Sequence, residues 1–160
     1  MERYDFLEEY REDNRIEAKR AQGGLPHSLW ETYSAFANTL GGVILLGVAE
    51  ADDKSLFSVP VPDVNALVDE FWTLVNDPAV TNVNILSPED VQILKSDGLP
   101  IVAIFVPRAG FRDRPVYIGT DPYTGTYYRR GEGDCRCPGH EVEAMLRDKH
   151  DPAPLSGITK

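Results

Sequence analysis

Glu12, Glu17 and Glu50 are the residues of this chain whose type and spacing best suit chemistry. If the segment with Glu17 forms a strand beside the apolar strand that ends at Val48, the three carboxylates converge near the strand ends. Converging carboxylates bind hard cations such as Mg²⁺ or Mn²⁺, which polarise phosphoryl groups and activate water. The alternative interpretation is a set of scattered surface acids in an acid-rich protein.

Basic residues accompany these acids. Lys19 follows Glu17 by two positions, so both side chains share one face of a strand, and its ammonium group could stabilise charge on a cleaved phosphate. A second basic segment is Tyr127-Tyr128-Arg129-Arg130. Its paired arginines suit phosphate contacts, and the neighbouring tyrosines could stack on bases. The alternative for residues 127–130 is an edge strand with half-buried tyrosines and solvated arginines. The candidate nucleic-acid-binding residues are Arg15, Lys19, Arg20, Arg129 and Arg130.

Two cysteines and a histidine form a weaker candidate site. Cys135, Cys137 and His140 supply three soft ligands within six residues, but structural zinc usually has four ligands, often from CxxC pairs. The sequence therefore argues against zinc. A disulfide bridge between cysteines two positions apart is strained, so the two free thiols favour a reducing cytoplasm.

No apolar stretch reaches the roughly 18 residues of a membrane helix, and no signal peptide is visible. A cytoplasmic protein without a membrane partner is expected.

The charge of the chain limits its affinity for nucleic acid. The net charge is −10, whereas phosphate backbones are bound by lysine and arginine. The acids are concentrated, however: residues 50–97 hold ten acids and two lysines. The rest of the chain is close to neutral, which leaves room for a local basic face.

Hydrophobic periodicity predicts the elements that must position these residues. Apolar steps of three and four residues predict helices over residues 2–12, 29–40, 64–75 and 141–149. Alternation and short apolar runs predict strands over 14–20, 43–48, 56–59, 83–85, 91–94, 101–106, 116–118 and 126–129. Strands in hairpins and across helices favour an α+β fold, a mixed β-sheet flanked by helices in a single domain over 1–150. Residues 151–160 are typical of a linker or a truncated tail.

Three motifs occur in a recognisable order. They are ExxxxEAK at residues 12–19, AFANTLGGVILLGV at 35–48 and YYRRG at 127–131. Together they resemble the Schlafen AlbA-like domain over about residues 5–148. The resemblance implies a mixed sheet with flanking helices. It also implies a bacterial module commonly described as DNA-binding, ATP-binding or a transcriptional regulator, often placed at the N-terminus of a longer protein.

The resemblance also suggests a second activity. Animal Schlafen proteins cut tRNA and rRNA with a metal-dependent carboxylate trio, which by position falls on Glu12, Glu17 and Glu50, with Lys19 beside it. This chain departs from the family in having Ala49-Glu50 where two aspartates are usual, which lengthens the third carboxylate by one methylene. The animal nucleases also use two modules in tandem, so that a homodimer of this chain could supply the second.

Three functional hypotheses follow. The leading one is a nucleic-acid-associated regulatory module, the N-terminal domain of a DNA-binding transcriptional regulator. The first alternative is a metal-dependent endoribonuclease that acts on structured RNA such as tRNA, with Glu12, Glu17, Lys19 and Glu50 as catalytic residues. The second alternative is a protein-interaction or ligand-sensing domain whose acidic middle faces a partner. Whether DNA, RNA or ATP binds stays open at this point.

Overall fold

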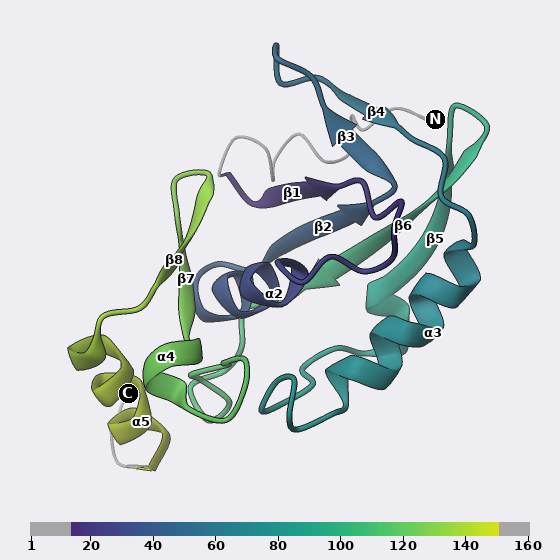
Figure 1. Ribbon diagram of the computed structural model, residues 1–160. Coiled ribbons are helices and arrows are strands. Elements are labelled where there is room, and N and C mark those ends of the chain that lie inside the picture. Colours follow the sequence, from purple (N-terminus) through teal and green to yellow (C-terminus); the bar gives the residue numbers. More distant parts are fainter. Residues whose placement is uncertain (1–13, 151–160) are drawn as a thin grey trace.

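A mixed four-stranded sheet organises the molecule (Figure 1). The computed structural model describes residues 14–150, so Glu12, the predicted helix over 2–12 and the tail 151–160 lie outside the described residues. The strand order is β1–β2–β6–β5, with bounds β1 Ile16–Lys19, β2 Gly42–Leu46, β6 Leu99–Val106 and β5 Val91–Ser96. β1 runs parallel to β2, while β6 is antiparallel to both β2 and β5. The predicted α+β fold with a mixed sheet is confirmed.

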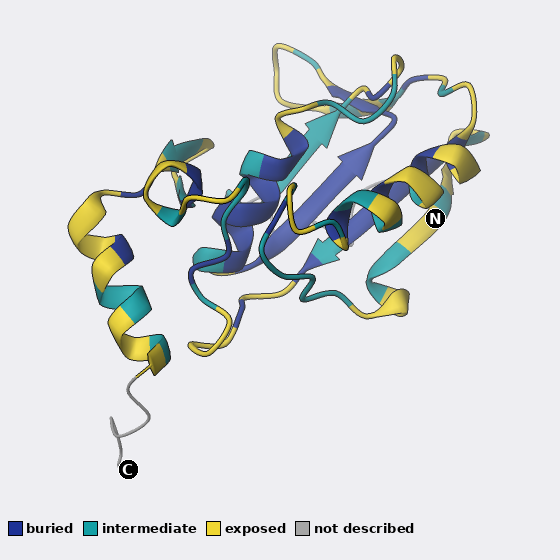
Figure 2. Ribbon diagram, turned by 60° about the horizontal axis from the view of Figure 1, so that its bottom comes forward, coloured by how far each residue is buried: buried dark blue, intermediate teal, exposed yellow. Residues whose placement is uncertain are grey.

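Helices α2 (Leu29–Asn38) and α3 (Val64–Val75) contribute the apolar side chains that cover one face of this sheet. Phe36 of α2 and Phe71 of α3 lie in one buried cluster with Ile44 of β2. Val43 and Leu45 belong to a separate cluster on the opposite face. β2 is therefore buried along its whole length, as its uninterrupted apolar sequence predicts (Figure 2).

The apolar run that begins in β2 does not continue as one strand. Gly47 has φ +86, a left-handed conformation that glycine adopts readily, and the chain turns there. The next strand, β3 (Val48–Glu50), pairs instead with β4 (Leu56–Ser58) in a hairpin beside β1 (Figure 1). The prediction of a single strand over 43–48 is wrong for this reason. The turn at Gly47 also directs the chain that carries Glu50 toward β1.

The C-terminal part adds a second hairpin and two helices. β7 (Tyr127–Arg130) and β8 (Gly133–Arg136) form the hairpin, which contacts α2. The short α4 (Pro122–Gly125) precedes it, and α5 (Gly139–His150) follows it. The helix predicted over 141–149 is confirmed, whereas α4 and β8 were not predicted. Among the described residues, no helix is long and apolar enough to cross a bilayer.

Two predicted strands are wrong because side chains take the place of a β ladder. In the segment 83–85, which leads to the 3₁₀ helix η2 (Pro88–Asp90), the hydroxyl of Tyr33 donates to the carbonyl of Val83 and accepts from the amide of Ile85. In the segment 116–118, the Asn38 side chain bonds both backbone groups of Val116. The remainder of that segment makes isolated β-bridges rather than a strand.

Candidate functional site

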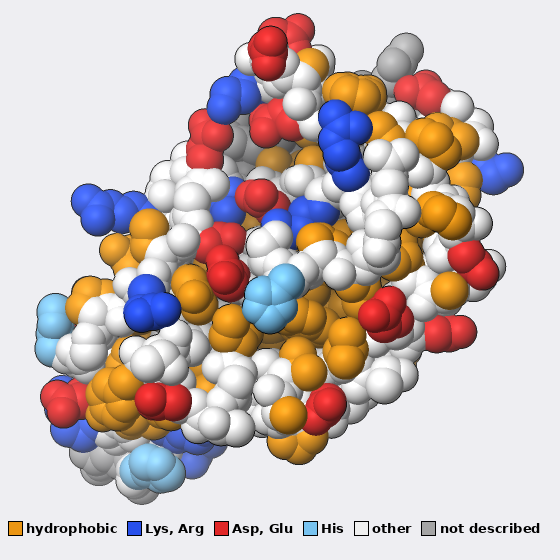
Figure 3. Space-filling view, in the orientation of Figure 1, with side chains coloured by type: hydrophobic (Ala, Val, Ile, Leu, Met, Phe, Trp, Pro, Cys, Tyr) orange, Lys and Arg blue, Asp and Glu red, His pale blue; other side chains and the backbone are white. Residues whose placement is uncertain are grey.

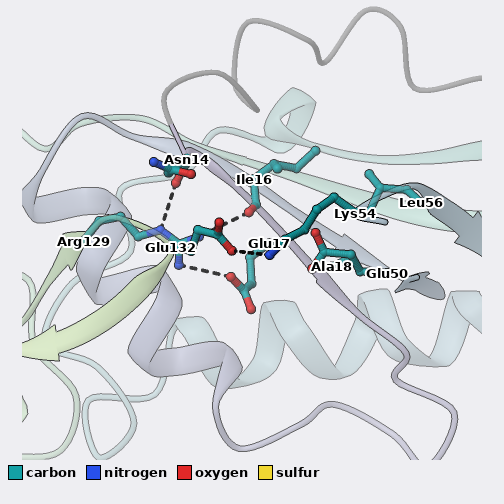
Figure 4. A pocket seen from close by; sticks show the side chains of 9 residues that line it. All are labelled: Asn14, Ile16, Glu17, Ala18, Glu50, Lys54, Leu56, Arg129 and Glu132. Atoms are coloured by element: carbon teal, nitrogen blue, oxygen red, sulfur yellow. Dashed lines mark hydrogen bonds and ion pairs between the residues drawn. The ribbon is translucent and has the colours of Figure 1, made fainter. Parts of the chain in front are cut away.

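A polar cavity of about 230 Å³ lies beside β1. Its walls come from β1, from the β3–β4 hairpin and from the β7–β8 hairpin, three segments far apart in the sequence. Acidic and basic side chains gather in a hollow on this face of the molecule (Figure 3). The lining residues are Asn14, Ile16, Glu17, Ala18, Glu50, Lys54, Leu56, Arg129 and Glu132 (Figure 4).

Glu17 is the most firmly held acid of this cavity. Its Oε1 lies 3.1 Å from Nη1 of Arg129, and its Oε2 lies 3.9 Å from Nζ of Lys19. Burial raises the pKa of the Glu17 carboxyl, and it outweighs the charges of Lys19 and Arg129, which act in the opposite direction. The carboxylate is therefore oriented by its neighbours, yet it keeps its proton to a higher pH than an exposed glutamate does.

Arg129 reaches from β7 across to β1 (Figure 4). Its Nε donates to the carbonyl of Asn14 at 2.9 Å, and its Nη2 donates to the carbonyl of Ile16 at 3.3 Å. Its Nη1 also donates to Oδ1 of Asp134 at 2.8 Å. The side chain is only 6% exposed. Its assignment to phosphate binding stays a prediction, while its contacts make it a positioning residue for Glu17 and for the start of β1.

Side chains from α2 and from Thr39, which caps its C-terminal end, hold Arg129 in place. Thr32 donates to Oδ2 of Asp134 at 2.6 Å, on the carboxylate that Arg129 contacts. The hydroxyl of Thr39 accepts from the backbone amide of Arg129, and the side-chain Nδ2 of Asn38 donates to the backbone carbonyl of Tyr127. The AFANT segment of the sequence thus fastens β7 to α2.

Asp134 was missed by sequence reasoning. It lies directly opposite Arg129 in the β7–β8 ladder, where an acid and a base form a cross-strand pair. The signal was present in the sequence, but it could be read only if β8 were recognised as a strand.

The other predicted basic residues fall into two groups. Lys19 donates to the hydroxyl of Ser28 at 3.0 Å, with 10% of its side chain exposed. Arg15 donates to the carbonyls of Leu40 and Gly41. Arg20 and Arg130, by contrast, are exposed. The structure therefore leaves these two guanidinium groups on the surface, whereas Arg15, Lys19 and Arg129 bind protein atoms.

Glu50 shares the cavity with Glu17, at the end of β3, and is exposed. Lys54 and Glu132, which sequence reasoning missed, form an ion pair at the same cavity, with 3.0 Å between Nζ and Oε1. The hydrogen bond from Lys54 to Glu132, followed by the charges of Glu132 and Glu50, raises the pKa of the Lys54 ammonium group.

A divalent cation is the cofactor that the acids of this cavity suggest. Glu17 and Glu50 offer the oxygen donors that Mg²⁺ and Mn²⁺ prefer. Within residues 14–150, no three acid, histidine or cysteine side chains are grouped closely enough to hold a metal ion. Glu12, the third predicted ligand, lies outside the described residues, so the metal site stays a prediction with two of its members on one cavity.

Comparisons with known proteins agree with this fold. The family described as Schlafen, AlbA_2 matches residues 12–138. No curated protein matches the chain. The solution structure of the N-terminal domain of a RecG-related protein from Nitrosomonas europaea is similar, with 32% identity and a TM-score of 0.58 over 83% of this chain and 91% of that one.

A more distant structure shares the fold alone. The DIP2311 protein from Corynebacterium diphtheriae is 19% identical, with a TM-score of 0.56. The similarity covers 92% of this chain but 25% of that one, so this chain spans about a quarter of the longer protein.

Proposed function

Because this chain belongs to the Schlafen AlbA_2 family, we propose that it is a nucleic-acid-associated module, the N-terminal domain of a DNA-binding transcriptional regulator. The similar domain from Nitrosomonas europaea is N-terminal in a RecG-related protein that is named as a candidate ATP-dependent DNA helicase. That N-terminal position supports a module that is joined to a second domain with a nucleic-acid-processing or regulatory role.

The observation that carries the proposal is the polar cavity beside β1 and the exposed arginines next to it. Arg20 directly follows β1, and Arg130 directly follows the cavity residue Arg129 on β7. Both guanidinium groups are exposed, and we expect them to contact phosphates of a strand that lies along this side of the molecule. Lys19 and Arg15, which neighbour cavity residues in the sequence, bind the hydroxyl of Ser28 and the carbonyls of Leu40 and Gly41, and so hold the segment around β1 in place.

The test is a binding titration by fluorescence anisotropy with labelled single-stranded DNA, duplex DNA and tRNA at about 50 mM salt. Loss of two phosphate contacts predicts that the double variant Arg20→Glu/Arg130→Glu binds at least about tenfold more weakly. Lys95→Glu changes an exposed cation on β5, outside the cavity, and serves as the control. If the wild-type protein binds none of these nucleic acids, the proposal fails and the protein-interaction or ligand-sensing alternative takes its place.

A second candidate function is a metal-dependent endoribonuclease that acts on structured RNA such as tRNA. The observation that favours it is that Glu17 and Glu50 line one cavity with Lys19 adjacent to Glu17. Glu17 and Glu50, together with Glu12, would hold Mg²⁺ or Mn²⁺, which when bound would polarise the scissile phosphoryl group. Arg129 would keep Glu17 oriented, and the ammonium group of Lys19 would stabilise negative charge on the phosphate.

Cleavage of labelled tRNA with Mn²⁺ or Mg²⁺ tests this second function. Glu17→Gln keeps the shape of the side chain but removes its charge, so metal-dependent cutting should be lost. Glu89→Gln, an exposed carboxylate of η2 outside the cavity, should cut like the wild type. Equal cutting by both variants would point to a contaminating nuclease, and binding without cutting by the wild type would leave a binding module.

A further inference from the structure

A second basic surface lies away from the cavity, in the loop that follows β6. Residues 107–114 contain three arginines and one acid, Asp113. Ala109 is buried and anchors the loop through its amide, which donates to the carbonyl of Ala37 at the end of α2. Arg108 and Arg112 are exposed. In Figure 2 the loop after β6 is largely yellow, in keeping with its mostly exposed residues.

An aromatic ring lies among these arginines. Phe111 is 38% exposed, and the guanidinium of Arg112 lies over its ring at 5.0 Å from the centroid. The loop therefore presents a flat aromatic and guanidinium surface to solvent beside positive charge. Base rings stack on surfaces of this kind when they are not already stacked in a duplex.

The last turn of α5 extends the same surface. It lies beside the loop in both ribbon views (Figures 1 and 2), and it contributes Arg147 and Lys149. Burial and the charge of Arg108 lower the pKa of the Arg114 guanidinium, while the carboxylate of Asp148 raises it, so these three groups lie within electrostatic range. Residues 107–114 and 147–149 together hold five cations and two acids, although the chain as a whole carries −10.

We propose that this loop–helix patch, formed by Arg108, Phe111, Arg112, Arg114, Arg147 and Lys149, binds a single-stranded segment of nucleic acid, with phosphates on the arginines and a base stacked on Phe111 or Arg112. An acidic peptide would satisfy the charges but would make no use of the exposed ring. The inference deepens the proposed function, on which it rests, because it requires that the domain binds nucleic acid. It adds a contact surface outside the cavity and selects unpaired strands over duplexes.

The experiment compares matched variants by fluorescence anisotropy on a labelled single strand of roughly ten nucleotides and on the corresponding duplex. Loss of one stacking surface predicts that Phe111→Ala weakens single-strand binding about tenfold and changes duplex binding little. Phe57→Ala is the control, because Phe57 is 40% exposed on β4 but belongs to neither the patch nor the cavity lining. Circular dichroism melting of each variant checks that it is folded.

A second measurement addresses the charges. In Arg108→Ala/Arg112→Ala, the slope of log affinity against log salt for the single strand should fall by about 0.7 for each lost phosphate contact. Lys95→Ala, which removes an exposed cation on β5, should leave the slope unchanged.

The outcomes separate the two proposals. If the wild type binds, and Arg20→Glu/Arg130→Glu weakens binding while Phe111→Ala matches Phe57→Ala, the patch is excluded and the proposed function stands. Equal loss of single-strand and duplex binding in Phe111→Ala would also overturn the stacking role. If the wild type binds no nucleic acid, both proposals fall together, and binding of an acidic peptide would then identify a protein surface.

Discussion

The guanidinium of Arg129 lies 3.1 Å from the carboxylate of Glu17, although the two residues belong to hairpin and sheet segments at opposite ends of the described chain. The same guanidinium donates to two backbone carbonyls at the start of β1. The position of the central acid of the cavity is therefore set by β7 as well as by its own strand. Because β7 is in turn fastened to α2, the three sequence motifs meet in one structural unit.

Replacement of this arginine should cost much of the stability of the domain. Arg129→Met leaves the carboxylates of Glu17 and Asp134 without their buried partner, which predicts a loss of about 3–5 kcal/mol. Urea unfolding followed by circular dichroism measures it as a lower midpoint. Arg130→Met, at the exposed neighbouring position, should change the free energy of unfolding by less than about 0.5 kcal/mol. Equal midpoints for the two variants would show that the Arg129 contacts contribute little.

The Asn38 side chain should be nearly as important, for a different reason. Its side-chain Nδ2 donates to the backbone carbonyls of Val116 and Tyr127, and its Oδ1 accepts from the backbone amide of Val116. Asn38→Ala leaves the amide of Val116 without its partner and removes a hydrogen bond from each carbonyl, although Ser34 still donates to that of Val116, which predicts a loss of about 1–3 kcal/mol. Asn65→Ala, at an exposed position of α3, should be close to neutral. Hydrogen exchange should also quicken in β7 of the Asn38 variant, and unchanged protection there would argue against the fastening role.

Gly42 should tolerate no side chain. A Cβ at this position would lie 2.7 Å from the carbonyl oxygen of Arg15 and 2.8 Å from the ring of Phe36. Because β1, α2 and β2 meet at this point, Gly42→Ala should destabilise the domain by about 1–3 kcal/mol. Gly23 has open space around it, so Gly23→Ala should be harmless. The thermal unfolding midpoints of the two variants test the contrast, and a Gly42→Ala protein as stable as the wild type would refute it.

Tyr33 should make stability fall at alkaline pH. Burial raises the pKa of its phenol to about 12, from an ordinary value of 10.0. Between these values the folded state retains a proton that the unfolded state has lost, so stability decreases as the pH rises. A difference of this size corresponds to roughly 3 kcal/mol in total.

Tyr33→Phe isolates this effect. At neutral pH the variant should be about 1–2 kcal/mol less stable, because Val83 and Ile85 lose their hydrogen bonds to the phenol. Urea titrations at pH 10 and pH 12 should find that the wild type loses this advantage. A stability difference between the two proteins that stays constant over that range would contradict the pKa shift.

Local sequence patterns predicted the elements that local forces determine. The apolar run of β2 is typical of a buried central strand, and Asp63 is of a residue type that favours helix N-caps; its side chain accepts from the amide of Ala66 at the start of α3. The turn at Asp97-Gly98 follows from residues that adopt positive φ readily, here +52 and +83.

Features that depend on tertiary contacts could not be predicted from local sequence patterns. The turn at Gly47 lies inside an apolar sequence that reads as one strand, and only the pairing of β3 with β4 separates it. Arg129 looked like a surface arginine because the carbonyls and carboxylates that surround it come from residues 14–17 and from β8. The segment around Val83 has strand-like residues, but Tyr33 takes the hydrogen bonds that a neighbouring strand would need.

The location of the candidate site was partly accessible. The sequence predicted that Glu17 and Glu50 would converge if the strand of Glu17 lay beside the apolar strand ending at Val48. In the structure both acids line one cavity. Lys54 and Glu132 complete that cavity from turns of the two hairpins, where no periodicity marks them. The roles of Glu17 and Glu50 as metal ligands remain a prediction, which the cleavage assay tests.

The most direct test of the central claim is the affinity of the wild-type protein for single-stranded nucleic acid as a function of salt concentration. Phosphate contacts by exposed arginines predict that log affinity falls linearly with log salt, with a slope of about −0.7 per contact. A slope near −1.4 or steeper would support binding through at least two such contacts. Affinity that does not change with salt, or no binding even at low salt, would contradict a nucleic-acid-associated role for this domain.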